Sequence, residues 1–186
     1  MRLIPFCGAF QKPKRAPVRT LVRLADLSAE SEDLGTVVGL VGAFAKEEQA
    51  LEAETERLRA LLPSFTSGFT FLAEETRGDQ RVACGYAMCV LKMNSFQGCL
   101  ALELHDIFVA KDFRHAGVGQ MLMDAVVAAA KERGCLKLTL NTHELNVNAR
   151  AFYEIRNGFE CYDNYLVRGG GAPIKGRSLM YSKKLT

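Results

Sequence analysis

The chain has 186 residues, of which 48% are apolar and 24% are charged, and its formal net charge at pH 7 is +3. That length favours one domain with one core, and so small a net charge, with the charged residues scattered, gives no basis for nucleic-acid binding. The longest apolar run, residues 34–45, is shorter than the roughly 18 to 20 residues that a membrane-spanning helix needs, so we expect a core helix there and no membrane association.

Basic residues dominate the start of the chain. Those that precede the first acidic residue, Asp26, are Arg2, Lys12, Lys14, Arg15, Arg19 and Arg23. We expect residues 1–17 to be a solvated basic arm and residues 18–186 to be a single folded domain. The alternative for the arm is a weak organelle-targeting or docking segment, and it lacks the continuous apolar stretch of a secretory signal.

The cysteines form no C-x-x-C pair and lie mostly in apolar, strand-like runs. They are Cys7, Cys84, Cys89, Cys99, Cys135 and Cys161. A zinc site needs clustered ligands at short spacing. We therefore expect no metal, and instead reduced, buried thiols in a reducing compartment, which favours the cytoplasm.

Local patterns predict the first half of the domain in chain order. Residues 18–24 alternate as a strand does, and Ser31, with acidic residues around it, predicts the start of a helix whose apolar spacing continues to Phe44. A second, more polar helix is expected from about residue 47 to 62, ended by Pro63. Three strands, joined by turns at 77–79 and 94–98, then make an antiparallel meander over residues 69–74, 81–91 and 100–110.

The second half alternates helix and strand. Helices are expected over residues 118–133 and 148–157, each followed by a glycine at its C-terminal cap. Strands are expected over 136–140, 159–167 and 178–183. A strand, a helix and a second strand imply a right-handed crossover and a parallel pair. The predicted fold class is α/β (α+β) with a mixed sheet, in which the meander is followed by one β-α-β unit.

Two glycines, Gly117 and Gly119, stand where a strand end turns into a helix. Glycines at such a turn let backbone N–H groups approach a ligand closely, and the positive end of the helix favours anions. Arg114 adds a cation just upstream. The arrangement suits a pyrophosphate.

Other phosphate-binding loops fit this segment less well. A dinucleotide-binding fingerprint places a third glycine where Leu122 stands, although Glu144 lies at a tolerable distance for a ribose contact. A nucleotide P-loop needs lysine and then serine or threonine after its last glycine, and here Gln120 and Met121 follow Gly119. Tight packing of the helix against a strand is the purely structural alternative for the glycines.

Two motifs stand at the right separation in this half of the chain. The first is Val109-x-x-x-x-Arg114-x-x-Gly117-x-Gly119, and the second is Asn146-Val147-Asn148-Ala149-Arg150-Ala151-Phe152-Tyr153 followed by Gly158-Phe159. Together they resemble the motifs of the GNAT (Gcn5-related) N-acetyltransferases. The resemblance extends over residues 18–183. It implies the GNAT fold, with the two parallel strands splayed apart, and acetyl-CoA as co-substrate.

The resemblance also implies which residues contact acetyl-CoA. Backbone groups of the strand before the loop would bond the pantetheine, the loop amides would hold the pyrophosphate, and the second motif would lie beside the far side of the cofactor. The residues are Ile107, Phe108, Val109, Arg114, His115, Ala116, Gly117, Val118, Gly119, Gln120, Asn146, Asn148, Ala149, Phe152 and Tyr153.

Acetyl transfer to an amine needs groups that move protons. Deprotonating an amine of pKa near 10.4 at pH 7 costs roughly 4 to 5 kcal/mol. Tyr153 matches the family tyrosine that faces the thioester sulfur, and we expect it to protonate the departing thiolate; a core aromatic beside Phe152 is the structural alternative.

The base is expected on the strand before the loop. Glu103 and His105 alternate with Ile107 and Val109, and period-two geometry points all four to one face unless a bulge turns one of them away. The resemblance implies a glutamate at either position, and histidine titrates near neutral pH. We favour Glu103 acting through water, with His105 close behind and Asp106 and Glu144 after them.

The predicted function is transfer of an acetyl group from acetyl-CoA to a primary amine. A small-molecule amine is slightly preferred over a protein lysine or N-terminus. The preference is only slight because the fold and the cofactor motif do not choose among acceptors. The alternatives are an acyl-CoA-binding sensor without catalysis and a partner-dependent subunit. Related enzymes often form dimers, so the resemblance leaves a homodimer open.

Overall fold

The computed structural model describes residues 19–48, 54–162 and 178–185. Within this part of the chain, seven strands form one mixed sheet in the order β1-β2-β3-β4-β5-β7-β6. Their bounds are β1 Arg19–Leu24, β2 Gly68–Arg77, β3 Gln80–Asn94, β4 Cys99–Val109, β5 Lys137–His143, β6 Glu160–Tyr162 and β7 Ser178–Lys184. The first four strands pair antiparallel and β4 pairs parallel with β5, which confirms the predicted mixed sheet.

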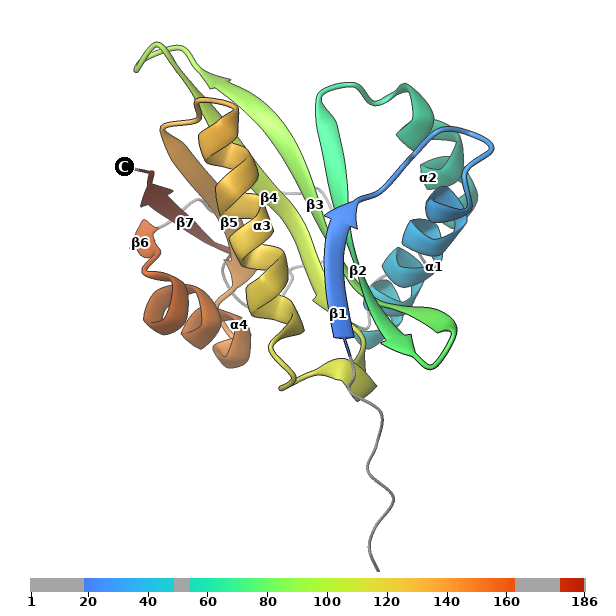
Figure 1. Cartoon of the computed structure of the whole chain (residues 1–186). Helices are drawn as coiled ribbons and strands as arrows, with labels where there is room; N and C mark the ends of the chain where they lie inside the picture. The colour runs from blue at the N-terminus through green and yellow to red at the C-terminus, as the bar shows by residue number, and fades with distance from the viewer. Residues whose placement is uncertain (1–18, 49–53, 163–177, 186) are drawn as a thin grey trace, which may run out of the picture.

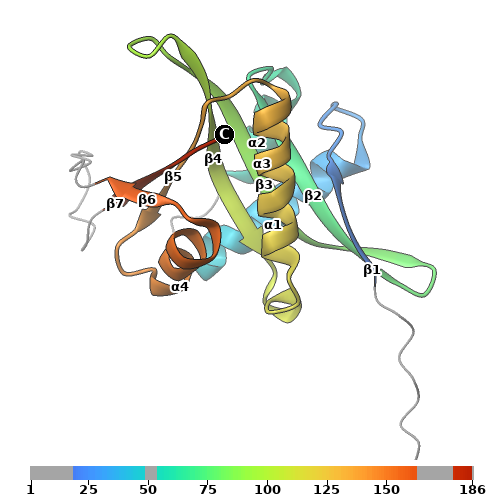
Figure 2. The ribbon, with the colours of Figure 1, turned by 60° about the vertical axis from the view of Figure 1, so that its left-hand side comes forward.

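Helices cover both faces of this sheet. Helix α3 lies on one face, and α1 and α2 lie on the other (Figures 1 and 2). A fourth helix, α4, follows β5 and continues as a π-helical turn, η3. The bounds are α1 Glu32–Glu47, α2 Thr55–Leu61, α3 Val118–Glu132, α4 Val147–Ala151 and η3 Phe152–Arg156. None of the described helices is long and apolar enough to cross a membrane.

Two apolar clusters form the core, one on each side of the sheet. Residues of α3 such as Leu122 and Val126 pack with the strand residues Leu102 and Leu104. On the opposite face of the sheet, residues of α1 pack with strand residues such as Tyr86, and together they form the α1-side cluster. The period-two alternation of the strands therefore supplies a core on each face, as expected for a buried sheet.

Local signals explain where the helices begin, and some boundaries differ from the prediction. The Ser31 side chain accepts a hydrogen bond from the Asp33 amide at the start of α1, as the capping pattern predicts. The expected start of the second helix near residue 47 is wrong. Helix α1 continues to Glu47 because Phe44 still packs against the α1-side cluster, and α2 begins only at Thr55.

Two further predictions fall partly outside the described residues. The basic arm over residues 1–17 lies outside them, as does most of the predicted strand at 159–167, of which β6 is the described part. The cysteine prediction holds for Cys84, Cys89 and Cys135, which are free and buried. Cys99 is free but only half-buried, and the prediction of burial is wrong for Cys161, which is exposed on β6. Cys7 is not among the described residues.

An ion-pair cluster fastens β1 to the rest of the fold. The Arg23 guanidinium donates to the Asp33 carboxylate of α1 at 2.8 Å and to the Glu74 carboxylate of β2 at 2.9 Å. These hydrogen bonds from Arg23 lower the pKa of Asp33 below its usual 3.8. Because a lowered carboxyl pKa stabilises the folded state only while the group is charged, this contribution is present at neutral pH and disappears as the pH falls through the folded pKa.

Asp33→Asn should therefore lower the free energy of unfolding by about 1 to 3 kcal/mol at pH 7, since it removes charged hydrogen bonds from a half-buried arginine. The difference from the wild type should shrink in urea titrations as the pH falls below about 4. The control is Glu54→Gln, because the Glu54–Arg57 pair is 69% and 83% exposed and such pairs contribute little. Equal stability of the Asp33→Asn variant and the wild type at pH 7 would show that the cluster does not fasten β1.

Candidate active site

The turn that precedes α3 has the backbone of an anion-binding loop. His115 and Gly117 both have positive φ angles, 63° and 85°, and Gly117 caps the helix without any side-chain hydrogen bond. The Gln120 and Met121 amides donate to the Gly117 carbonyl at 3.0 and 3.1 Å. The amides of residues 116–119 have no acceptor in the described part of the chain. They stand at the positive end of a long helix, where an anion is stabilised.

Arg114 is already held beside this turn. Its Nε donates to the Val109 carbonyl at the end of β4, 2.8 Å away, and its guanidinium lies 5.8 Å from the centre of the Phe108 ring. Its Nη2 forms an ion pair with Glu47, the last residue of α1. A phosphate at the turn would compete with Glu47 for the same guanidinium.

The parallel strands β4 and β5 separate partway along their length. Their pairing runs from Ala101 with Lys137 to Leu104 with Leu140 and then stops, although β4 continues to Val109. This separation confirms the predicted splay. On its β5 side, the backbone of residues 105–109 is thus free of a strand partner. The short 3-10 helix Lys111–Phe113 then leads from β4 to the turn before α3.

A bulge divides β4 at the same place. Leu104 pairs with Cys89 and Asp106 pairs with Met88, so His105 is the extra residue. Side chains therefore change face across it: Leu104 and Ile107 both pack on the α3 side. Glu103, His105, Ile107 and Val109 therefore do not share one face: the bulge, which the sequence left open as the exception, resets the alternation.

The two predicted base candidates lie next to each other on β4. The Glu103 carboxylate is mostly buried and forms an ion pair with Lys92 of β3. The Nδ1 atom of His105 is 3.6 Å from the Glu103 Oε1 atom, and its side chain is 56% exposed. Glu103 thus precedes the bulge and already has a cationic partner, whereas His105 forms the bulge.

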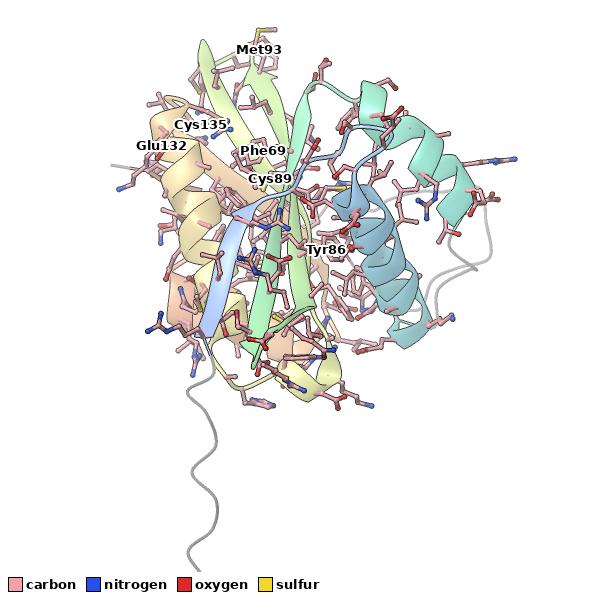
Figure 3. The ribbon with its side chains drawn as sticks, turned by 45° about the vertical axis from the view of Figure 1, so that its right-hand side comes forward. Phe69, Tyr86, Cys89, Met93, Glu132 and Cys135 are labelled. Atoms are coloured by element: carbon pink, nitrogen blue, oxygen red, sulfur yellow. The ribbon has the colours of Figure 1, made fainter. Side chains whose placement is uncertain are left out.

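Asp106 is the carboxyl group that the bulge turns toward the α1 side. It stands opposite Met88 and two residues before Phe108, both of which belong to the α1-side cluster. Burial raises the pKa of Asp106 above its usual 3.8, and the nearby His105 opposes this. Tyr86 lies on the same side of the sheet, facing α1 (Figure 3), and its buried hydroxyl has no hydrogen-bond partner in the structure as described.

Tyr153 lies at the start of the π-helical turn and is only 6% exposed. Its ring contacts those of Phe152, Phe159 and Tyr181, with centroids 5.5, 6.0 and 6.1 Å away. Burial, followed by the negative charge of Asp106, raises its pKa above the usual range. The hydroxyl therefore keeps its proton at neutral pH, as a proton donor must.

The rest of the second motif connects this tyrosine to the turn. The Asn146 side chain caps α4 by accepting from the Ala149 amide at 3.1 Å, whereas Asn148 is exposed. A Cβ atom on Gly119 would lie 3.8 Å from both the Phe152 ring and the Val109 side chain. Phe152 thus packs where the turn, β4 and α4 meet, and a larger residue at position 119 would press on this contact.

Sequence reasoning missed the polar contacts that hold η3 in place. The Gln120 side chain donates to Asn157 at 2.9 Å, and Asn157 donates to the Phe152 carbonyl at 2.9 Å. The Tyr181 hydroxyl donates to Glu154 at 2.7 Å. Gln120 and Asn157 are 37 positions apart and Tyr181 and Glu154 are 27 apart, so no local spacing marks these two pairs. No group of three or more potential metal ligands occurs among the described residues.

Comparisons with known proteins agree with this geometry. The acetyltransferase (GNAT) family model matches residues 19–159. Streptothricin acetyltransferase A of Bacillus subtilis (strain 168) is 42% identical over 50 residues, which are 27% of this chain and 29% of that protein. The match therefore spans less than a third of the curated relative's length.

Solved structures share the fold. The crystal structure of nourseothricin acetyltransferase is 27% identical, with a TM-score of 0.54 over 65% of this chain and 67% of that one. A chain of the NatC complex bound to Gag peptide and CoA has a TM-score of 0.70 at 17% identity, over 90% and 99% of the two chains, a likeness of fold alone. Because the family model matches most of its length, this chain belongs to the acetyltransferase (GNAT) family, a family of acyltransferases.

Proposed function

We propose that the protein is an N-acetyltransferase that moves the acetyl group of acetyl-CoA to a primary amine, with a small-molecule amine as acceptor. The observation that carries the proposal is the adjacency of two features. A turn with unpaired amides at the start of α3 follows the part of β4 that β5 leaves unpaired, with only the short 3-10 helix Lys111–Phe113 between them. The turn suits the pyrophosphate of a CoA thioester, and the strand suits its pantetheine.

This chain's own residues fit that ligand. The amides of residues 116–119 would bind the pyrophosphate, and Arg114 would add a positive charge once it is released from Glu47. Backbone groups of Ile107 and Val109 would hydrogen-bond the pantetheine amides. Acetyl-CoA, when bound, supplies an activated acyl group as a thioester.

The chemistry then depends on proton movement near the gap between β4 and β5. Backbone N–H groups at the separated strands would stabilise charge on the carbonyl oxygen. Tyr153, protonated and buried, would donate its proton to the departing sulfur. A base on β4 would take the proton of the amine; the sequence offers Glu103 through water, His105 and Asp106 as candidates.

The relatives favour a small amine over a protein. Two proteins that match part of this chain, a streptothricin acetyltransferase and the nourseothricin acetyltransferase, are named for small-molecule acceptors. The NatC complex, whose structure holds a peptide, shares only the fold at 17% identity. We therefore place the acceptor among small molecules that carry a primary amine.

An acceptor screen tests this proposal. The full chain is incubated with acetyl-CoA and, in turn, with nourseothricin, spermidine, an aminoglycoside and a lysine-containing peptide, and CoA release is measured together with the mass of the acceptor. We expect acetylation of at least one small amine and slower acetylation of the peptide. Tight acetyl-CoA binding without transfer to any acceptor would favour the sensor function, and faster peptide acetylation would overturn the choice of acceptor.

Glu47→Gln should bind acetyl-CoA more tightly than the wild type. The substitution removes the carboxylate that competes with phosphate for Arg114, and since both side chains are about a third exposed, the pair contributes only about 0.2 to 1 kcal/mol. The expected gain is up to about fivefold in Kd by calorimetry, and it should shrink at high salt. Glu48→Gln, at the exposed neighbouring position, is the control; equal gains in both variants would show that Glu47 exerts only a general charge effect.

A further inference from the structure

We propose that Asp106 binds the ammonium group of the acceptor and takes its proton. The inference rests on the proposed function and names a base that neither the β4 alternation nor the family motifs identify. It follows from the bulge in β4, from the partners of the neighbouring ionisable groups and from the tyrosine that lies diagonally opposite on β3.

The first observation is the position of Asp106. The bulge at His105 turns Asp106 onto the side of the sheet that α1 covers, opposite Met88. The last β4 residue that pairs with β5 is Leu104. Asp106 therefore belongs to the segment of β4 that has lost its parallel neighbour, where an acyl group and an amine would meet.

The second observation is the charge around it. Glu103 is paired with Lys92, and His105 lies beside Glu103. Asp106 has neither a hydrogen bond nor an ion pair from its side chain among residues 19–48, 54–162 and 178–185. A mostly buried carboxylate of this kind costs free energy unless a cation arrives to balance it.

Tyr86 of β3 adds a phenol group to these surroundings. It is the diagonal neighbour of Asp106 on the same face of the sheet, because Tyr86 pairs with Phe108 and Met88 pairs with Asp106. Burial first, and then the charge of Asp106, raise the pKa of Tyr86 and of Tyr153 on η3. Burial raises the pKa of Asp106, and the neighbouring His105 on β4 opposes this rise. On α1, the Phe44 ring lies 5.5 Å from the Phe108 ring, measured between their centres. The ionisable Glu47, at the end of the same helix, is bound to Arg114. A carboxylate with a phenol oxygen on the same face is complementary to an ammonium ion.

The proton balance of the transfer follows from this arrangement. The ammonium gives one proton to the Asp106 carboxylate, and the nitrogen lone pair then attacks the thioester carbon. A C–N bond forms, the C–S bond breaks, and its electron pair leaves on sulfur, which takes the Tyr153 proton. The second proton of the nitrogen restores Tyr153 through water, and Asp106 releases its proton to solvent. Burial of Asp106 makes it a stronger base than an exposed aspartate.

The test compares three variants that each replace an ionisable side chain by an amide, Asp106→Asn, Glu103→Gln and His105→Gln, on the small amine that the wild type acetylates. We expect Asp106→Asn to lower kcat/KM at pH 7 by roughly 10²- to 10⁴-fold and to lose the acidic limb of the pH profile, with acetyl-CoA affinity unchanged. Its deficit should narrow as the pH approaches the pKa of the amine, because the free base then needs no proton acceptor. The other two variants should keep the acidic limb.

Thermal unfolding of each variant controls for folding. Because burial disfavours the charged Asp106, Asp106→Asn should be at least as stable as the wild type at pH 8. Asp106→Ser is measured alongside, as a smaller replacement. An active wild type whose Asp106 variants keep full kcat/KM and the acidic limb overturns this inference alone. A wild type that acetylates no amine overturns the proposed function, and the role of Asp106 with it.

Discussion

Gly117→Val should weaken acetyl-CoA binding by about 5- to 150-fold. Gly117 has a φ of 85° at the start of α3, a conformation that a β-branched residue adopts only at a cost of about 1 to 3 kcal/mol. A change in the backbone of the turn would relieve that strain. The amides of residues 116–119 would then no longer point toward one pyrophosphate. Since about 1.4 kcal/mol corresponds to tenfold in affinity, calorimetric titration with acetyl-CoA measures the loss directly.

The matched control is Gly134→Val at the other end of α3. Gly134 also has a positive φ, 69°, and a Cβ atom at either glycine would meet nothing within 4 Å. Both variants should lose similar thermal stability, but only Gly117→Val should lose acetyl-CoA affinity. Equal affinities in the two variants would show that the turn before α3 is not where the co-substrate binds.

Tyr153→Phe should lower kcat by roughly 10²-fold or more while leaving acetyl-CoA affinity unchanged. The substitution keeps the ring contacts with Phe152, Phe159 and Tyr181 and removes only the proton that the sulfur receives. Steady-state kinetics with the amine at saturation, together with calorimetry for acetyl-CoA, separate the two effects.

Tyr181→Phe is the control for this substitution, because Tyr181 contacts the same ring. Its hydroxyl donates to Glu154 and accepts from Arg150, which ties η3 to β7. Its removal should cost about 1 kcal/mol of stability and leave kcat near the wild-type value. If kcat of Tyr153→Phe also stays at the wild-type value, Tyr153 has no part in the proton transfer.

Much of the fold follows from local signals in the sequence. The meander is marked by turn residues between alternating strands, and the glycines after Arg133 and Asn157 both have positive φ angles at helix ends. The turn before α3 is marked by Gly117 itself. These features depend on residues close in sequence, so a single sequence carries them.

The parts that escaped prediction depend on distant partners. Nothing in the run from Glu103 to Val109 distinguishes a regular strand from one with an extra residue, because the bulge at His105 is defined by its register against Met88 and Cys89. Asp106 consequently ranked below Glu103 among the candidate bases. The pair between Glu47 and Arg114 joins residues 67 positions apart, and only the tertiary fold brings them together.

The most direct test of acetyl transfer is mass spectrometry of the acceptor after incubation with acetyl-CoA carrying a ¹³C-labelled acetyl group. The full chain and its Gly117→Val variant are each given nourseothricin and spermidine, with CoA release followed in parallel. We expect the wild type to place the labelled acetyl group on an amine nitrogen, in step with CoA release, and the variant to lose this activity at low acetyl-CoA concentration. Wild-type protein that binds acetyl-CoA but leaves every amine unlabelled would contradict the proposed acetyl transfer.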